Sequence, residues 1–151
     1  MALYLVQHGK SLPKAQDPER GLSKQGIANV KCIAYEAREH DLVISRIQHS
    51  DKKRAIQTAE IIANALNPQN GMQQISGINP LDDVSIFATQ ISNRDNIMIV
   101  GHLPFLEKLT SYLIMGAIDK LVLKFQNGGI VCLDQENGAW FIKWTLMPKI
   151  G

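Results

Sequence analysis

The sequence has few of the residues that define several protein classes. Two cysteines, Cys32 and Cys132, are too few among 151 residues for a disulfide framework or a four-cysteine zinc site. Sixteen basic and fourteen acidic residues leave a net charge of only +2, so we expect neither nucleic acid nor an anionic membrane as a partner. Both cysteines lie among apolar residues and are expected to be buried free thiols, which suits a reducing compartment.

Long apolar runs and leader segments are also missing. No run reaches the roughly 20 residues that span a bilayer. The N-terminus turns polar at Gln7 without a basic region or a small-residue cleavage site. No repeat or Pro/Gly-rich linker divides the chain, and its 45% apolar content is typical of a globular protein. We therefore expect one cytoplasmic domain over residues 1–151.

Apolar runs alternate with segments of helical periodicity. Continuous apolar runs indicate buried strands, and apolar residues at helical spacing after Ser23 and Ser50 indicate helices that these serines cap. The alternation predicts an α/β fold with a mixed sheet and helices on both faces. The predicted strands are 2–6, 43–49, 73–75, 96–100, 121–125, 129–133 and 140–146, and the predicted helices are 24–39, 50–66, 83–91 and 104–115.

Three candidate functional residues occupy similar places in this pattern. His8 and His102 each follow the end of a predicted strand, and Arg54 lies in the first turns of the helix after another. Open α/β sheets bind ligands at the carboxyl ends of their strands, where these three side chains could converge. Taken singly, each residue has a plainer interpretation, as a loop histidine or as a surface arginine in a salt bridge. His40 and His49 have no comparable setting and are expected to be structural or solvated.

Together the three side chains suit phosphoryl transfer. A neutral imidazole can attack phosphorus and carry the phosphoryl group covalently. A guanidinium group matches phosphate oxygens through paired, charge-assisted hydrogen bonds, and a second histidine, if cationic, can stabilise the charge that develops on the transferred group. This chemistry needs no metal.

Four segments resemble the histidine phosphatase superfamily, which has the phosphoglycerate mutase-like fold. They follow the family's order and cover most of the chain. The short length and residues 125–131 (FQNGGIV) are most similar to the small bacterial phosphohistidine phosphatases of the SixA type. The four segments are residues 5–11 (LVQHGKS), 22–26 (LSKQG), 50–59 (SDKKRAIQTA) and 100–104 (VGHLP).

The resemblance implies a fold and a role for each matched residue. The fold would be a three-layer α/β/α sandwich with a mostly parallel mixed sheet. His8 would be the nucleophile, Arg54 would bind the phosphate and His102 would stabilise the transferred phosphoryl group, without a metal or another cofactor. The partner would be a phosphorylated protein, such as a histidine-containing phosphotransfer domain, or a small phosphorylated metabolite.

The sequence departs from the family at Gln7, where the first signature block has an arginine. Glutamine can still bind phosphate through its amide, but it brings no charge, and a lost hydrogen bond to a charged group costs about 1.5–3 kcal/mol. Lys10 or Arg20 could supply a cation instead. No motif fixes a general acid, although Asp82 and Asp83 lie in the right region.

A missing acid is tolerable for phosphohistidine, because its P–N bond is labile and imidazole leaves more easily than an alkoxide. We therefore expect a metal-independent phosphatase for protein phosphohistidine that forms a phosphohistidine intermediate. Two alternatives remain open. One is a small-molecule phosphomonoesterase with the same mechanism, and the other is a non-catalytic phosphate- or phosphoprotein-binding module, which the loss of the arginine would favour.

Overall fold

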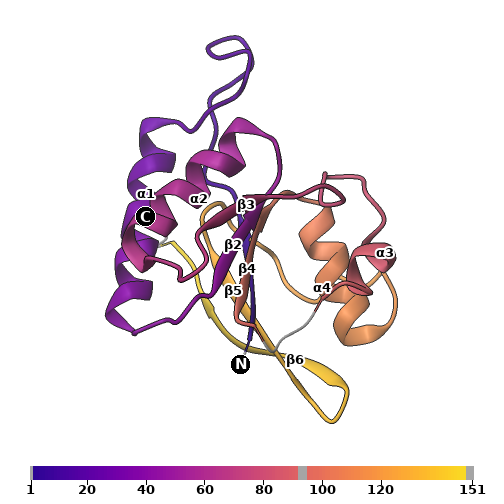
Figure 1. The fold of residues 1–151 in the computed structure, drawn as a ribbon. Coiled ribbons are helices and arrows are strands. Elements are labelled where there is room, and N and C mark those ends of the chain that lie inside the picture. The colour runs from indigo at the N-terminus through magenta and orange to yellow at the C-terminus, as the bar shows by residue number, and fades with distance from the viewer. Residues whose placement is uncertain (1, 92–94, 149–151) are drawn as a thin grey trace.

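A computed structural model describes residues 2–91 and 95–148. It contains a six-stranded sheet with the strand order β3-β2-β4-β1-β5-β6. Figure 1 shows this sheet between two pairs of helices, as the predicted three-layer sandwich requires. The strands are β1 (Leu3–Gln7), β2 (Arg46–His49), β3 (Met72–Gln74), β4 (Ile97–Gly101), β5 (Ile130–Glu136) and β6 (Ala139–Leu146), and the helices are α1 (Lys24–Glu39), α2 (Lys53–Leu66), α3 (Val84–Ala88) and α4 (Phe105–Met115).

The sheet is parallel in its first four strands and antiparallel in its last two. β2 pairs in parallel with both β3 and β4, and β4 pairs in parallel with β1. β5 runs antiparallel to β1 and to β6. The carboxyl ends of β2, β4 and β1 therefore lie next to one another at one edge of the sheet, the upper edge in Figure 1.

Alternate residues of β1 enter two separate cores. Tyr4 and Val6 face α1 and α2, and they pack in a cluster that includes Val30 and Ile62. Leu3 and Leu5 face α3 and α4 and join a second apolar cluster there. The period of two along a strand explains this division. Because both faces of β1 are covered, its sequence is a continuous apolar run.

The bounds of α1 and α4 agree with the sequence to within one residue, whereas those of α2 differ. α1 spans the predicted residues, and the Ser23 hydroxyl accepts the Gly26 N–H as its N-cap. Asn67 ends α2 in the left-handed conformation with φ of 50°. However, Ser50 does not cap α2. That helix begins three residues later, after Lys52, which makes no side-chain capping bond, so the Ser50 hydroxyl is used elsewhere.

Other predictions need correction. Residues 121–125 form no strand, because the chain after α4 runs without regular structure until β5. α3 is shorter than the predicted helix and covers Val84–Ala88, and β2 begins only at Arg46. Cys132 is buried as expected, whereas Cys32 lies on the exposed side of α1. None of the helices within residues 2–91 and 95–148 is both long and apolar enough to cross a membrane.

Candidate active site

The three candidate residues meet at the carboxyl edge of the sheet. His8 directly follows β1, and its backbone N–H donates to the Gly101 carbonyl at the end of β4, 3.0 Å away. His102 follows that glycine, and the two imidazole rings lie 5.1 Å apart, centroid to centroid. Arg54 lies in the first turn of α2, and its Nε is 3.3 Å from the Nε2 of His8. The predicted convergence is present in the structure.

The contacts of His8 determine which ring nitrogen is nucleophilic. Its Nδ1 lies 2.7 Å from the carbonyl oxygen of Gly9. A carbonyl can only accept, so Nδ1 must carry the proton and Nε2 keeps its lone pair. This lone pair points at the Arg54 guanidinium. A ring nitrogen with a lone pair, next to a guanidinium group that could bind phosphate oxygens, is an arrangement that suits nucleophilic attack on phosphorus.

His102 is more deeply buried than His8. It is 1% exposed, and its Nε2 lies 2.6 Å from the hydroxyl oxygen of Ser50, itself 1% exposed. Its other ring nitrogen, Nδ1, is buried and has no hydrogen-bond partner among the described residues. Buried polar atoms are rarely left unpaired, so Nδ1 is available for a ligand.

A buried threonine ties the His8 loop to α2. The Thr58 hydroxyl accepts the Gly9 N–H at 2.9 Å and donates to the Arg54 carbonyl at 2.8 Å. One side chain thus fixes both the peptide that orients His8 and the helical turn that carries Arg54. Gly26 completes the contact of α1 with this loop, since a Cβ there would lie 2.1 Å from the Lys10 carbonyl oxygen. Neither role was recognised from the sequence.

Burial and neighbouring cations keep both histidines neutral. The pKa of His8 is lowered to about 4, mainly by burial. The hydrogen bond to Gly9 raises this pKa, whereas the positive charges of Arg54 and Arg20 lower it further. Burial is also the main cause that lowers the pKa of His102 to about 3, followed by the charges of His8 and Arg54. In the unliganded site His102 is therefore neutral, and it could act on a phosphoryl group as an N–H donor and not as a cation.

We therefore expect His8 and His102 to stay neutral, each with a single ring proton, from about pH 7 down to about pH 5 in the unliganded protein. Both pKa values lie below the ordinary value, so the unfolded chain takes up protons first and the free energy of unfolding falls as the pH drops below about 6.5. Bound phosphate should raise both pKa values. Both pKa values are measured from the ring ¹⁵N chemical shifts as a function of pH, with and without phosphate, and the signals are assigned with single His variants. A midpoint near pH 6.5 for either ring would contradict it.

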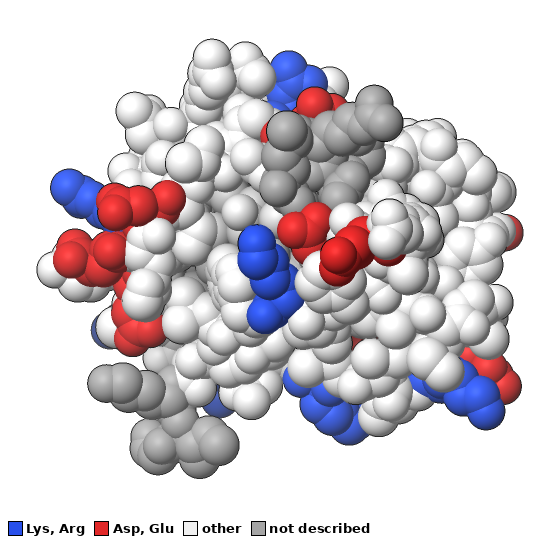
Figure 2. Space-filling model, turned by 90° about the horizontal axis from the view of Figure 1, so that it is seen from below, with Lys and Arg blue, Asp and Glu red and all other residues white. Residues whose placement is uncertain are grey.

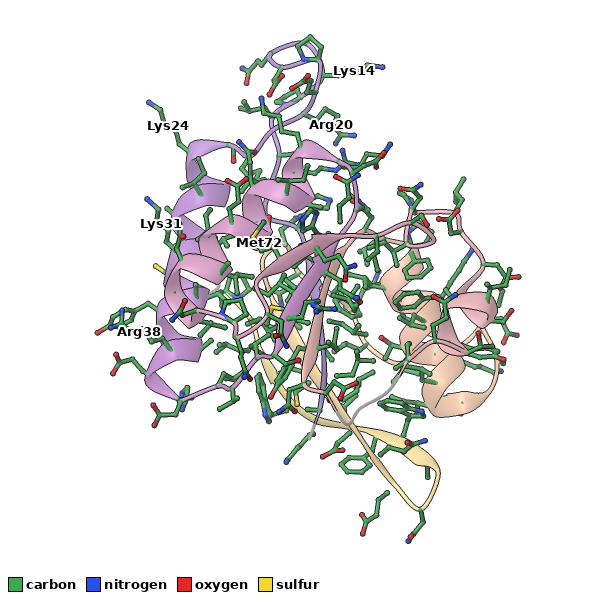
Figure 3. All side chains as sticks on the ribbon, viewed as in Figure 1. Lys14, Arg20, Lys24, Lys31, Arg38 and Met72 are labelled. Carbon is green, nitrogen blue, oxygen red and sulfur yellow. The ribbon has the colours of Figure 1, made fainter. Side chains whose placement is uncertain are left out.

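Of the two cations considered for the place of the missing arginine, Arg20 lies near the site. It lies at the base of the loop between β1 and α1, and Figure 3 shows it close to the start of α2, where Arg54 lies. Burial is the main cause that lowers the pKa of Arg54, and the positive charge of Arg20 is the second cause. The same charge also lowers the pKa of His8. Lys10 instead extends toward α1, where its Nζ lies 3.4 Å from the Gln25 side chain.

Within residues 2–91 and 95–148, the Arg20 guanidinium forms no ion pair with a carboxylate. The nearby carboxylates of Asp17 and Glu19 pair with Lys53 instead, at 3.0 and 3.7 Å. In the described structure, the Arg20 side chain instead donates a hydrogen bond to the Ser11 hydroxyl at 3.5 Å. Its backbone has a φ of 53°, a conformation that costs a non-glycine residue about 1 kcal/mol or more. An arginine in this backbone conformation, near His8 and Arg54 and without an acidic partner in the described part of the chain, suits anion binding.

The comparison with protein families decides the identity of this site. The family model described as "Histidine phosphatase superfamily (branch 1)" matches residues 3–78, which is half of the chain. The chain belongs to the histidine phosphatase superfamily. The match contains His8 and Arg54, and a search among curated proteins found no match.

Solved structures of histidine phosphatases share the fold over nearly the full length. The protein histidine phosphatase SixA, complexed with tungstate, superposes with a TM-score of 0.81 at 22% identity and covers 98% of this chain and 97% of its own. A candidate phosphohistidine phosphatase SixA from Agrobacterium tumefaciens gives 0.77 at 26% identity, covering 97% of both chains. The alpha-ribazole phosphatase from Shigella flexneri gives 0.78 at 14% identity, with coverages of 99% and 96%. Family and neighbours together assign the chain to the phosphatases, a class of hydrolases.

The side chain of Gln7, which replaces the first arginine of the superfamily signature, makes no hydrogen bond to His8, Arg54 or His102 among the described residues. It lines a cavity of about 400 Å³ together with Lys10, Asn29 and the turn 125–127. Its Oε1 is buried and has no hydrogen-bond partner in the described part of the chain. Gln7 as a phosphate ligand therefore stays a prediction.

The two carboxylates considered as general acids serve local structure. Asp83 caps α3 by accepting from the Ser85 N–H at 2.8 Å, and its hydrogen bonds, first that from the Ser85 hydroxyl, lower its pKa. A carboxyl group with a lowered pKa is a poor proton donor. Asp82 accepts the Asn79 N–H at 2.8 Å. No bond from either carboxylate to the site histidines occurs among the described residues, and no cluster of three metal-ligating side chains occurs there.

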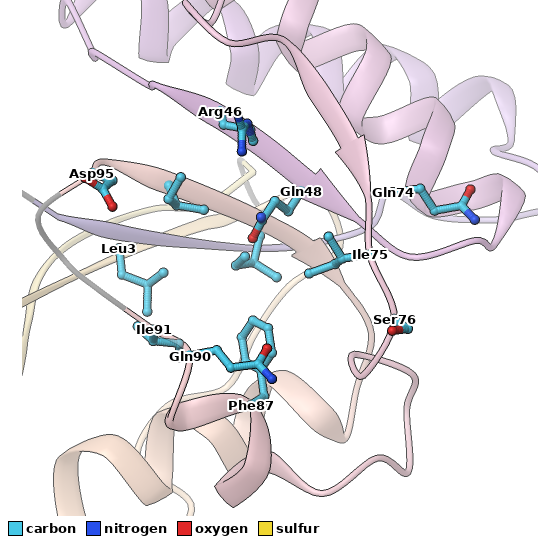
Figure 4. Close-up of a pocket in the computed structure, with 12 residues that line it drawn as sticks. Leu3, Arg46, Gln48, Gln74, Ile75, Ser76, Phe87, Gln90, Ile91 and Asp95 are labelled. Carbon is cyan, nitrogen blue, oxygen red and sulfur yellow. The ribbon is translucent and has the colours of Figure 1, made fainter.

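The remaining histidines and cavities are separate from this site. His49 is buried with its Nδ1 2.9 Å from the Ser50 carbonyl oxygen, and His40 is exposed at the end of α1. Figure 4 shows a cavity of about 520 Å³ between β2–β4 and α3, whose lining includes Arg46, Gln48 and Phe87 but no residue of the site. Figure 2 views the opposite end of the molecule, where basic and acidic side chains are interspersed in the part of that face that is described.

Proposed function

We propose that this chain, acting as one cytoplasmic domain over residues 1–151, is a metal-independent phosphatase that uses His8 as its nucleophile. One observation supports it most. The Nε2 of His8 carries no proton and accepts a hydrogen bond from the Arg54 Nε–H at 3.3 Å, in the fold and motif order of a histidine phosphatase. The two unpaired cysteines are compatible with the reducing cytoplasm.

The reaction takes two displacements at phosphorus. In the first, the His8 Nε2 lone pair forms a bond to phosphorus while the bond from phosphorus to the substrate atom breaks, and the released atom takes a proton from solvent. In the second, a water oxygen bonds to phosphorus, the bond from phosphorus to Nε2 breaks, and the water proton returns to solvent. The products are inorganic phosphate, the dephosphorylated substrate and neutral His8.

The surrounding groups stabilise the transferred phosphoryl group. Arg54 is placed to bind its oxygens, because its Nε already faces the nucleophilic nitrogen. Arg20 adds a second positive charge near both residues and substitutes for the arginine that Gln7 replaces. His102 would donate from its unpaired Nδ1. Such preorganised donors are worth more in a buried site than in water.

Phosphohistidine on a signalling protein is the substrate that this site fits best. Among the residues that the structure describes, no carboxylic acid is hydrogen-bonded to His8 or His102, where it could protonate an alkoxide leaving group. Imidazole needs less help, because its second ring nitrogen can be protonated by solvent before the P–N bond breaks. The names of the SixA structures agree with a protein substrate, whereas the name of the alpha-ribazole phosphatase supports the small-molecule alternative.

A substrate panel tests this proposal. The purified protein is assayed for phosphate release from a phosphorylated histidine-containing phosphotransfer protein and from common sugar and nucleotide phosphates. We expect kcat/KM to be highest for the phosphoprotein. A preference for one small phosphate would establish the phosphomonoesterase instead. Binding of phosphate or phosphoprotein without any turnover would establish a binding module, the alternative that Gln7 favours.

Chelators should leave the activity unchanged. The site offers two neutral histidines beside two arginines, whose positive charges would repel a cation, whereas metal hydrolases normally supply three or more protein ligands. Activity is measured after dialysis against EDTA and again after addition of Zn²⁺, Mn²⁺ or Mg²⁺. Loss in EDTA followed by recovery with one of these ions would refute a metal-free mechanism.

A further inference from the structure

Ser50 is buried at the end of β2 and its hydroxyl faces the site. The sequence predicts a helix cap at this position, but α2 starts only at Lys53. The freed hydroxyl oxygen lies 2.6 Å from the Nε2 of His102, and both residues are 1% exposed. Its other contact is with the Lys52 N–H, 3.3 Å away. A short hydrogen bond between two fully buried side chains defines their relative orientation.

Counting protons determines the direction of this bond. The Lys52 N–H can only donate, so it occupies one lone pair of the Ser50 oxygen. The Ser50 hydroxyl proton then needs an acceptor, and the Nε2 of His102 is the acceptor that the described structure places within reach. A buried hydroxyl without an acceptor would be costly. Ser50 therefore donates to Nε2, which must be unprotonated.

The same count assigns the proton of the His102 ring. Burial keeps this imidazole neutral, and a neutral imidazole carries one proton on one of its two nitrogens. If Nε2 accepts, the proton is on Nδ1. That N–H is buried and lacks an acceptor within the described residues, an arrangement that costs free energy until an acceptor arrives. A phosphoryl oxygen at the adjacent His8 would be such an acceptor, since the two rings lie 5.1 Å apart.

We propose that Ser50 is a positioning residue, which holds His102 in the tautomer with the proton on Nδ1 so that this N–H donates to the transferred phosphoryl group. The donation from Nδ1 to a phosphoryl group rests on the proposed function, whereas the assignment of the tautomer does not. The tautomer is a property of the folded protein and exists whether or not the protein turns over a substrate. The opposite tautomer, with the proton on Nε2, would leave Nδ1 unable to donate to phosphate.

The first test observes the tautomer directly. Two-bond ¹H–¹⁵N spectra of the protein labelled on its histidines, at about pH 7 without ligand, should show a protonated Nδ1 and a bare Nε2 for His102. Ser50→Ala should lose this preference. Ser111→Ala is the matched control, because Ser111 is equally buried but bonds the Ala117 carbonyl oxygen from α4. A protonated Nε2 in the wild-type protein would overturn the proposal, whatever the activity.

The second test measures the consequence for catalysis. Ser50→Ala should lower kcat about threefold to tenfold, the effect of one hydrogen bond, with KM little changed, and Ser50→Cys should recover part of the loss. Circular dichroism and thermal unfolding confirm that the variants are folded. An unchanged kcat in folded Ser50→Ala, or an equal loss in Ser111→Ala, would refute the role of Ser50. If the wild-type protein shows the expected tautomer but no turnover on any substrate, the proposed function fails and the assignment of the tautomer stands.

Discussion

Replacing His8 by alanine should abolish turnover and leave the fold intact. The substitution removes the nitrogen that bonds to phosphorus, and a lost covalent nucleophile costs roughly 10⁴-fold or more in kcat in other hydrolases. The fold should persist because, in the described structure, the ring nitrogens of His8 bond only the Gly9 carbonyl and the Arg54 guanidinium. Phosphate release and the midpoint of thermal unfolding are measured on the same preparation.

His40→Ala is the matched control for this prediction. His40 lies at the exposed end of α1, away from the carboxyl edge of the sheet, so its loss should leave kcat/KM unchanged. If His8→Ala kept more than about a tenth of the wild-type kcat, His8 would not be the nucleophile. If it lost activity together with its cooperative unfolding transition, His8→Gln would replace it, since that side chain keeps the bulk and a hydrogen-bonding group.

The second large effect concerns Arg20, the cation that we propose in place of the arginine of the family signature. Arg20→Ala should lower kcat/KM and weaken vanadate binding by roughly tenfold to a hundredfold, as expected for one lost hydrogen bond to a charged group. Adding Gln7→Arg to this variant should raise kcat/KM and strengthen vanadate binding by roughly tenfold, because it returns a guanidinium group to the position where the family has an arginine. In the wild-type background the same change should also strengthen binding, since it adds a further positive charge.

Lys14→Ala is the control for the loop charge, because Lys14 lies near the tip of the same loop (Figure 3) and should not reach the phosphate. If Arg20→Ala and Lys14→Ala behaved alike, Arg20 would have no specific role. If Gln7→Arg failed to restore activity, Gln7 would face only the cavity lined by residues 125–127, and its expected role in phosphate binding would be wrong.

The elements that bury an apolar face were predictable from the sequence. α1 has its predicted bounds because the apolar spacing and the Ser23 cap indicate the same limits. The run 121–125 is apolar but forms no strand: within it only Phe125 is buried, whereas Leu121 is 59% exposed and the backbone joins no sheet. Cys32 was misplaced because its apolar neighbours belong to the buried side of α1, whereas its own position faces outward.

The site was predictable where the residue type carries the chemistry. His8, Arg54 and His102 were found because each follows a strand whose carboxyl end lies at the same edge of the sheet. Ser50 and Thr58 were missed because their functions depend on contacts with residues 52 and 49 positions away in the sequence. A serine before a helix indicates a cap, and only the observed start of α2 shows that Ser50 is free to bond elsewhere.

The covalent intermediate is the most direct measure of the proposed mechanism. The protein is mixed with a ³²P-labelled phosphorylated phosphotransfer protein, quenched in alkali within milliseconds, digested and analysed by mass spectrometry. The account predicts one acid-labile, alkali-stable phosphate on the peptide that contains His8, and none when the His8→Ala variant is used. Turnover of the same substrate with no phosphate on His8 at any quench time, or equal labelling of His8→Ala, would contradict it.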